Sequence, residues 1–221
     1  MSARVRSSLS ADALAGLASR QANHLFPDGA DVTPADLAPA LAGAFARLEH
    51  CFTHIDNRYF FDGNQAVFDH LHGDQYAMWL YILSNELFRR GGPPAVCKKL
   101  FLLNKALHGC DIFHEVELPS VFLLVHPLGT VLGRGRYRDF LIAYQRVGIG
   151  SNRDVYPTLG HYLTLRPGSA VLGKASVGDN CSIAAESMLL DRDLPANSVY
   201  IGNPRDHTIR EQTRLQPIWR T

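Results

Sequence analysis

Apolar residues recur every three or four positions between residues 33 and 109, which is the pattern of amphipathic helices. Thr33-Pro34 is a good helix start, because the hydroxyl caps the first turn and proline has no N–H to lose. A second helix is predicted over 74–90 and a third over 95–108, with Gly109 as a left-handed cap. The first half of the chain is therefore predicted to be a helical domain.

The second half of the chain has an aliphatic residue at every sixth position, and four of these residues are followed four places later by a small residue. The aliphatic positions are Leu159, Leu165, Val171, Val177, Ile183 and Leu189, and the small ones are Ser169, Ala175, Cys181 and Ser187. Strands of a β-sandwich are longer and have a period of two. A period of six is typical of a hexapeptide β-helix, in which three short strands form one triangular coil and the coils stack about 4.8 Å apart.

The six-residue frame is interrupted between Gly150 and Leu159, where Arg153 stands at a position that should be aliphatic. A loop that leaves a rigid solenoid is a typical place for function. The short prism has flat faces and open ends, and association into a trimer would cover them. The predicted domains are helical over 1–109, β-helical over 110–205 and a C-terminal tail over 206–221.

Composition excludes several classes of function. The chain has 221 residues with 22 Lys and Arg against 21 Asp and Glu, and so small a net charge argues against sequence-independent nucleic-acid binding. The four cysteines show no paired metal spacing and are expected to be free thiols in a reducing compartment. Since no apolar leader and no run of about 18 apolar residues is visible, we expect a cytoplasmic protein without a membrane segment.

Several segments occur in the order and at the separations found in one enzyme family. Asp111-Ile112 is followed, fifteen residues after the aspartate, by His126. The further matching segments are 129–133, 145–150, 168–173 and 201–204. Together they resemble the hexapeptide-repeat acyltransferases, and among these the serine O-acetyltransferases. The resemblance covers about residues 98–205 and implies a helical N-terminal domain followed by a left-handed parallel β-helix.

The resemblance also implies acetyl-CoA as co-substrate, with His126 as general base and Asp111 as the carboxylate that orients it. A hydroxyl acceptor is a poor nucleophile unless a base takes its proton, and neutral imidazole does so near pH 7. A carboxylate on the other ring nitrogen fixes the tautomer and stabilises the imidazolium. A backbone N–H near Gly148 or Gly150 is expected to stabilise the oxyanion.

The coenzyme is expected in the groove between two neighbouring β-helices of a homotrimer. Main-chain groups of the coil 168–174 would line the pantetheine arm, and Lys174 or Arg205 would meet the nucleotide phosphates. The expected coenzyme-binding residues are Gly148, Gly150, Gly168, Ser169, Gly173, Lys174 and Arg205. Whether two trimers pair is open, and no metal is expected, because His50 and His54 lack a third ligand.

Two departures from the serine acetyltransferase pattern concern the acceptor. Val125 stands where the family has Asp before the base, and Val155-Tyr156 stands where it has Arg-His before proline. Valine holds neither the ammonium nor the carboxylate of an amino acid, which favours a sugar or sugar nucleotide as acceptor. The expected substrate-binding residues are Gln145, Arg153, Asp154 and Tyr156.

Two alternatives stay open from the sequence. One is a serine O-acetyltransferase with a remodelled acceptor pocket, and the other is a non-catalytic trimeric scaffold that kept the β-helix. The choice between O- and N-transfer to the small-molecule acceptor is also open.

Overall fold

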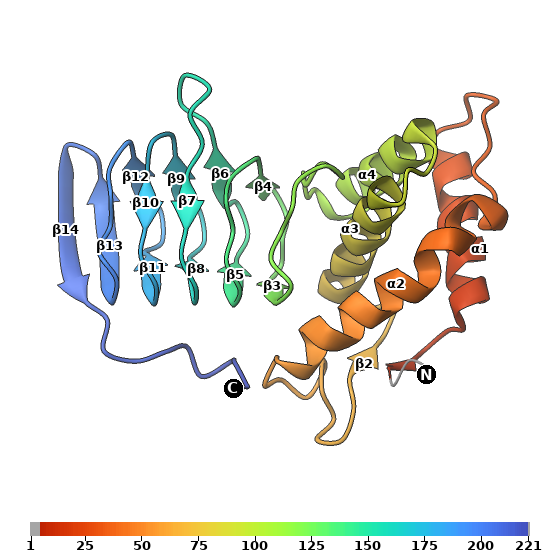
Figure 1. The fold of residues 1–221 in the computed structure, drawn as a ribbon, viewed down its shortest axis with the longest axis horizontal. Coiled ribbons are helices and arrows are strands. Elements are labelled where there is room, and N and C mark those ends of the chain that lie inside the picture. The colour runs from red at the N-terminus through yellow and green to blue at the C-terminus, as the bar shows by residue number, and fades with distance from the viewer. Residues whose placement is uncertain (1–4, 221) are drawn as a thin grey trace. The chain divides into compact units, whose positions relative to one another are not determined.

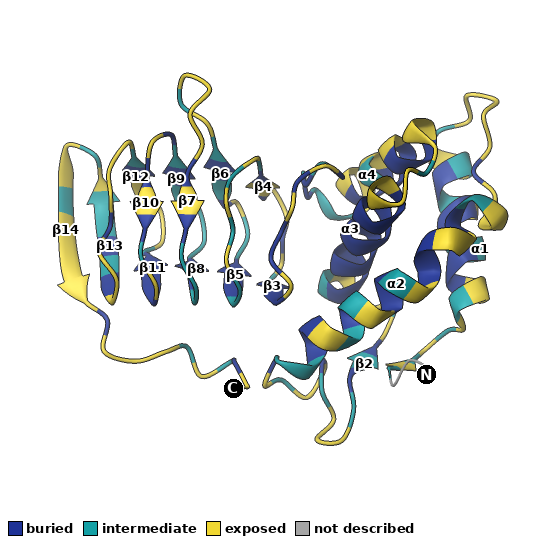
Figure 2. Cartoon of the chain, in the orientation of Figure 1, coloured by how far each residue is buried: buried dark blue, intermediate teal, exposed yellow. Residues whose placement is uncertain are grey.

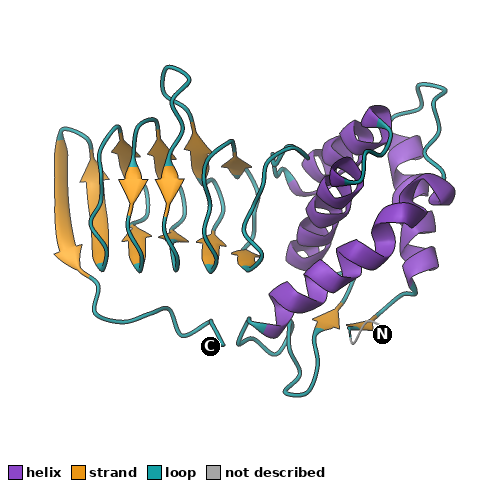
Figure 3. Cartoon of the chain, in the orientation of Figure 1, coloured by secondary structure: helices purple, strands orange, loops and turns teal. Residues whose placement is uncertain are grey.

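The computed structural model of the chain describes residues 5–220 (Figure 1). The chain forms two compact units with separate cores. One unit is helical and comprises 5–108 with 113–115 and 220, and the other is a solenoid that comprises 109–112 and 116–219 (Figure 3). This confirms the predicted order of a helical part followed by a parallel β-solenoid.

The helical unit contains four helices and a short pair of parallel strands among its described residues. The helices are α1 (Ala11–Leu25), α2 (Pro34–Thr53), α3 (Gly73–Arg89) and α4 (Pro94–His108), and the strands are β1 (Arg6–Ser7) and β2 (Val67–Phe68). Helices α2, α3 and α4 correspond to the three predicted ones. Thr33 caps α2 as expected, and Asp36 completes the capping box by accepting from the Thr33 N–H at 2.8 Å.

Helix α1 is the element that the apolar pattern does not predict. Ser10 caps its N-terminus, and the Ser10 hydroxyl accepts from the Ala13 N–H at 3.2 Å. The buried side of the helix consists of Leu14, Ala15, Ala18, Ser19 and Ala22. Because alanine contributes little apolar area, the segment looks merely polar and alanine-rich in the sequence although one side is packed.

Helix α3 is the most deeply buried element of the helical unit. Every residue from Gln75 to Leu87 is buried, as the dark colouring in Figure 2 shows. Gln75 is tolerated there because both ends of its amide are hydrogen-bonded. Its Nε2 donates to Tyr59 O at 2.6 Å, and its Oε1 accepts from the Asp69 N–H at 2.7 Å.

A nearly buried carboxylate connects α2 with α3. Glu86 accepts from Arg90 Nε at 2.8 Å and from Arg47 Nη1 at 3.2 Å. Burial disfavours the charged form of Glu86, but the hydrogen bonds from Arg90 and Arg47 outweigh it and hold the pKa of Glu86 below its usual range. Gly43 of α2 leaves space for this carboxylate, because a Cβ there would overlap the Glu86 Oε1 atom.

Twelve short strands form the solenoid unit between residues 109 and 219. They are β3 (Phe122–Leu124), β4 (Val131–Leu132), β5 (Leu141–Ala143), β6 (Gly148–Gly150), β7 (Thr158–Leu159), β8 (Thr164–Leu165), β9 (Ala170–Leu172), β10 (Ser176–Val177), β11 (Cys181–Ile183), β12 (Met188–Leu190), β13 (Ser198–Asn203) and β14 (Asp206–Glu211). The first sheet has the order β14-β13-β11-β8-β5-β3, the second β12-β9-β6-β4 and the third β10-β7. All neighbours are parallel except β13 and β14.

The interior of the solenoid follows the six-residue period. The six aliphatic residues of the pattern are at most 3% exposed, and the four small residues are buried with them. Each inward position therefore repeats at the same place in successive coils, which is why the period is visible in the sequence.

The corners of the solenoid are made by residues with left-handed backbone. Between the first and second sheets these residues include Gly129 (φ +73°), Arg146 (φ +56°), Gly168 (φ +71°) and Glu186 (φ +57°). Such a backbone favours glycine and costs other residues roughly 1–2 kcal/mol. Arg146 and Glu186 form an ion pair with each other across Gly168, where a Cβ would lie 2.5 Å from the Glu186 carboxylate oxygens.

The C-terminal segment runs back along the solenoid after β14. Gln212 bonds to Ser182 Oγ at 2.6 Å, and Gln216 Oε1 accepts from Arg166 Nη2 at 3.1 Å. Trp219 then packs edge-on against Phe140 at 5.4 Å. The segment therefore binds the coils from the last toward the first.

Candidate functional site

The corner between β3 and β4 is longer than a regular corner of the solenoid. β3 pairs with β5 at a spacing of 19 residues (Phe122 with Leu141), whereas β4 pairs with β6 at 17 (Val131 with Gly148). The corner therefore holds two extra residues. It presents His126, which is exposed and has a left-handed backbone with φ +49°. The imidazole thus stands on a corner that departs from the repeat.

The chain segment of Asp111 lies against this corner. The Asp111 N–H donates to Thr130 O at 2.9 Å, and Asp111 O accepts from the Leu132 N–H at 3.0 Å. Asp111 is half-buried. The structure brings this segment next to the corner that carries His126, and a bond between the two side chains stays a prediction.

The outer surface of the second sheet carries two glycines that the fold does not require. A Cβ on Gly148 would meet the Ala170 Cβ at 3.6 Å, and one on Gly150 would meet Leu172 Cδ2 at 3.7 Å, both ordinary contact distances. The bare backbone leaves this surface smooth. The Gly148 N–H donates to Ser169 O at 2.9 Å, so the sheet uses this amide and it is not available to an oxyanion.

The coil between β6 and β7 contains the second departure from regular length. β6 pairs with β9 at a spacing of 22 residues (Gly148 with Ala170), whereas β9 pairs with β12 at 18 (Ala170 with Met188), so this coil has four extra residues. They project as the long loop after β6 in Figure 1. Asn152 and Val155 exchange two N–H···O bonds of 3.1 Å each, which makes the loop a tight hairpin.

Arg153 and Asp154 form the tip of this hairpin, with φ +51° and φ +60°. Two successive residues with positive φ are typical of a type I′ turn, where asparagine and glycine are preferred. Both side chains are exposed, and Val155 and Tyr156 are 44% and 40% exposed. The hairpin therefore presents a guanidinium, a carboxylate and a phenol where β6 ends, whereas His126 stands where the neighbouring β4 begins.

Three further predicted residues lie at the corner between β5 and β6 and at the next corner, between β8 and β9. Gln145 is half-buried, its main-chain oxygen accepts from the Gly168 N–H at 3.0 Å, and its Oε1 has no hydrogen-bond partner. Ser169 is fully buried and its hydroxyl has no hydrogen-bond partner. Because the hydroxyl faces the interior, Ser169 offers only main-chain groups to an outside ligand.

The remaining predicted residues lie at other corners. Gly173 has φ +74° and precedes the exposed Lys174, whose N–H donates to Asp191 Oδ1 at 2.8 Å. Arg205 is exposed in the turn between β13 and β14. The sequence did not single out Asp191, which also accepts from Asn152 Nδ2 at 2.5 Å and so reaches the hairpin. Asp191 lies one coil after Gly173, and this spacing is the feature of the sequence that could have placed it beside the predicted coenzyme-binding residues.

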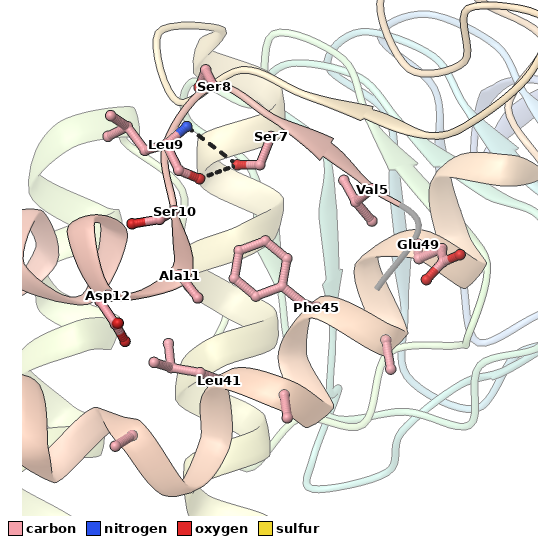
Figure 4. A pocket seen from close by; sticks show the side chains of 13 residues that line it. Val5, Ser7, Ser8, Leu9, Ser10, Ala11, Asp12, Leu41, Phe45 and Glu49 are labelled. Atoms are coloured by element: carbon pink, nitrogen blue, oxygen red, sulfur yellow. Dashed lines mark hydrogen bonds between the residues drawn. The ribbon is translucent and has the colours of Figure 1, made fainter. Parts of the chain in front are cut away.

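A separate hollow of about 1410 Å³ belongs to the helical unit, between the segment 5–12 and helix α2 (Figure 4). Its lining includes the apolar side chains of Leu41 and Phe45 and the carboxylates of Asp12 and Glu49. No histidine, cysteine or lysine is among the described residues that line it.

Residues 5–220 contain no group of three or more histidine, cysteine, aspartate or glutamate side chains placed to hold a metal ion. None of the helices described is both long enough and apolar enough to cross a bilayer. The four cysteines are free thiols and all are buried.

Comparison with known proteins gives one consistent result. No family model matches the chain. A serine acetyltransferase of Synechococcus elongatus is 28% identical over 163 residues, which is 72% of this chain and 62% of the relative. A serine acetyltransferase of Helicobacter pylori is 27% identical over 133 residues, which is 58% of this chain and 77% of the relative. The match thus spans less than two thirds of the Synechococcus protein's length.

Solved structures agree in fold. The crystal structure of serine acetyltransferase from Brucella abortus superposes with a TM-score of 0.72 at 19% identity, and covers 93% of this chain and 85% of that one. The same enzyme in complex with coenzyme A gives a TM-score of 0.69. The chain is therefore similar in sequence to serine acetyltransferases and has the β-solenoid fold of the solved serine acetyltransferase structures.

Proposed function

We propose that the protein is an acetyl-CoA-dependent acetyltransferase with His126 as general base. The position of the imidazole carries this proposal. It stands exposed on a lengthened corner, against the segment of Asp111 and beside a sheet whose surface glycines the fold does not need. The relatives named serine acetyltransferase and the neighbour solved with coenzyme A support the same donor.

The reaction follows from these groups. The acceptor hydroxyl oxygen attacks the thioester carbonyl of acetyl-CoA while His126 takes the hydroxyl proton. The C–S bond then breaks, and the imidazolium returns the proton to the departing sulfur of CoA. Asp111 accepts the hydrogen bond of the other ring nitrogen, which keeps the base in the tautomer that can take a proton.

The coenzyme would lie along the outer surface of the second sheet. The missing side chains of Gly148 and Gly150 allow the pantetheine arm to approach the backbone closely. Main-chain groups at Gly168, Ser169 and Gly173 would line the arm. Lys174 and Arg205, both exposed, would meet the phosphates as charged donors.

The comparisons favour serine over a sugar as acceptor, because the relatives reported above carry the name serine acetyltransferase. We therefore replace the sugar expectation with a small hydroxyl amino acid of the serine type. The valines at 125 and 155 imply that such a pocket is remodelled. Arg153 and Asp154 at the hairpin tip offer a guanidinium for the carboxylate and a carboxylate for the ammonium, and Tyr156 and Gln145 offer further polar contacts.

We infer that the working assembly is a homotrimer. Val131 and Met188 on the second sheet are 47% and 36% exposed, which is a large exposure for apolar residues on a regular strand. A second copy packed on this sheet would bury them and would bring its own groups to the surface beside His126. Light scattering is expected to give three times the chain mass of 24.5 kDa, and six times this mass would show paired trimers.

A CoA-release assay tests the catalytic proposal. The wild type is expected to release CoA from acetyl-CoA with L-serine faster than with amino-sugar nucleotides, and mass spectrometry identifies the acetylated product. His126→Ala is expected to lower kcat by about 10²–10⁴-fold, the usual contribution of a general base. Asp111→Asn is expected to lower kcat with little change in either KM.

His161→Ala is the matched control, because His161 lies at the corner between β7 and β8 and has no role in the proposal. It should leave kcat unchanged. Equal turnover by the wild type and His126→Ala would refute the assignment of the base. Faster turnover with the sugar nucleotides would restore the sugar acceptor, and no release with any acceptor would favour the scaffold alternative.

A further inference from the structure

The hairpin between β6 and β7 is attached to the solenoid by a side chain from two coils away. Asn152 Nδ2 donates to Asp191 Oδ2 at 2.5 Å, and the other carboxylate oxygen, Oδ1, accepts from the Lys174 N–H at 2.8 Å. One carboxylate therefore joins the hairpin, the coil after it and the coil after that. Both bonds have a charged acceptor and belong to the stronger class of hydrogen bonds.

Gly173 makes room for this carboxylate. A Cβ on Gly173 would overlap Asp191 Oδ1 and would lie 2.7 Å from the Asn152 Cβ. Asp191 itself has a left-handed backbone with φ +46°. The close packing of three main-chain segments around one carboxylate is thus specific to this corner of the solenoid.

The hairpin needs such support. Its tip holds two non-glycine residues at positive φ, which costs roughly 1–2 kcal/mol each. Within the hairpin, the two main-chain bonds between Asn152 and Val155 oppose this cost. The side-chain bond between Asp191 and Asn152 fixes where the hairpin leaves the coil.

We propose that Asp191 is a positioning residue that holds the hairpin in place for acceptor binding. This inference rests on the proposed function, in which Arg153 and Tyr156 of the hairpin contact the acceptor. In this proposal Asp191 is not itself a ligand of the acceptor. It acts through Asn152, and its loss should change how well the acceptor binds more than how fast the bound acceptor reacts.

Trypsin cleavage after Arg153 measures the attachment without any assay of activity. Because the bond at Arg153 is at an exposed hairpin tip, its cleavage rate reports how often the hairpin opens. Asp191→Ala is expected to raise this rate about tenfold, which corresponds to the loss of one charge-assisted hydrogen bond. Asp193→Ala is the matched control, since Asp193 also accepts from a main-chain N–H, that of Ser176 at 2.9 Å, but does not reach the hairpin.

The exchanged pair Asn152→Asp with Asp191→Asn is the rescue variant. Asn at 191 can still accept from the Lys174 N–H through its Oδ1 and can donate through its Nδ2 to Asp at 152. The double variant should therefore recover a slow cleavage rate, whereas Asn152→Asp alone places two carboxylates together and should raise it. A double variant that is cleaved as fast as Asp191→Ala would overturn the proposal even if every variant is folded.

Kinetics then connect the attachment with acceptor binding. Asp191→Ala is expected to raise KM for the acceptor at least about fivefold, and to raise it more than KM for acetyl-CoA, with kcat lowered less than twofold. Unchanged acceptor KM despite faster cleavage would contradict the positioning role. If the wild type shows no acetyl transfer, the proposed function fails, whereas the cleavage measurements still decide whether Asp191 holds the hairpin.

Discussion

Whether Gly43→Ala stabilises or destabilises the protein depends on the Glu86 carboxylate between α2 and α3. Replacing glycine by alanine inside a helix usually stabilises it by about 1 kcal/mol. At position 43 the new Cβ would lie 2.8 Å from both Glu86 Cδ and Arg90 Nη2, so the carboxylate has to move. A displaced Glu86 loses its bonds from Arg47 and Arg90, at 3.2 and 2.8 Å.

The magnitude of the effect follows from the exposure of the partners. A hydrogen bond to a charged group contributes about 1.5–3 kcal/mol when buried. The Arg90 side chain is 49% exposed and the Arg47 side chain is 25% exposed. Because solvent screens the more exposed pair, the bond from Arg90 to Glu86 contributes at most about 1 kcal/mol to stability. Loss of both bonds to Glu86 therefore costs about 2–3 kcal/mol, which exceeds the gain of about 1 kcal/mol from the higher helix propensity of alanine. Gly43→Ala should lower the free energy of unfolding by about 1–2 kcal/mol.

The assay is urea unfolding followed by the fluorescence of Trp79, which is buried in the helical unit, in a Trp219→Phe background. The midpoint should fall by about 0.5–1 M. Gly16→Ala in α1 is the control, because its Cβ would meet only the end of Arg20 at 3.2 Å, and it should raise the midpoint. If Gly43→Ala stabilises the protein as Gly16→Ala does, the reasoning about the Glu86 space is wrong.

Three other predictions concern the C-terminal segment, pH and thiols. Trp219→Ala removes the buried ring that packs on Phe140, should cost about 3 kcal/mol, and should speed digestion by carboxypeptidase; an unchanged rate would argue against the attachment. Burial lowers the pKa of His108 and His114. Their contribution to stability is therefore complete above about pH 6.5 and is lost on acidification, so the urea midpoint of the helical unit should fall between pH 7.5 and 5.5, and a constant midpoint would contradict it. Burial raises the pKa of Cys110 to about 12, and all four cysteines are buried, so Ellman's reagent should label them only after denaturation; rapid labelling of the native protein would show open thiols.

The sequence revealed the solenoid because each coil repeats its inward positions. Leu165 and Ile183, for example, lie one coil apart and pair directly in the first sheet. The two lengthened segments, the corner between β3 and β4 and the hairpin between β6 and β7, could be found in the sequence for different reasons. Arg153 interrupts the aliphatic frame, whereas His126 was found through its distance from Asp111 and its family resemblance, not through the periodicity.

Other features were not predictable from local pattern. Helix α1 buries mainly alanines, so its apolar face is weak. The bond between Asn152 and Asp191 joins residues 39 apart, and nothing in either neighbourhood indicates it. The sugar expectation rested on Val125 and Val155, and the comparisons support the serine alternative better.

Strand β14 has a consequence for the open end of the solenoid. A stack of parallel strands ends in unpaired main-chain groups to which a further parallel strand from another molecule can add. Here the last strand is antiparallel to β13 and five of its six residues are exposed, with Asp206, Arg210 and Glu211 among them. A charged strand of reversed direction is a poor template for the next molecule, and it protects the protein from growing end to end into filaments.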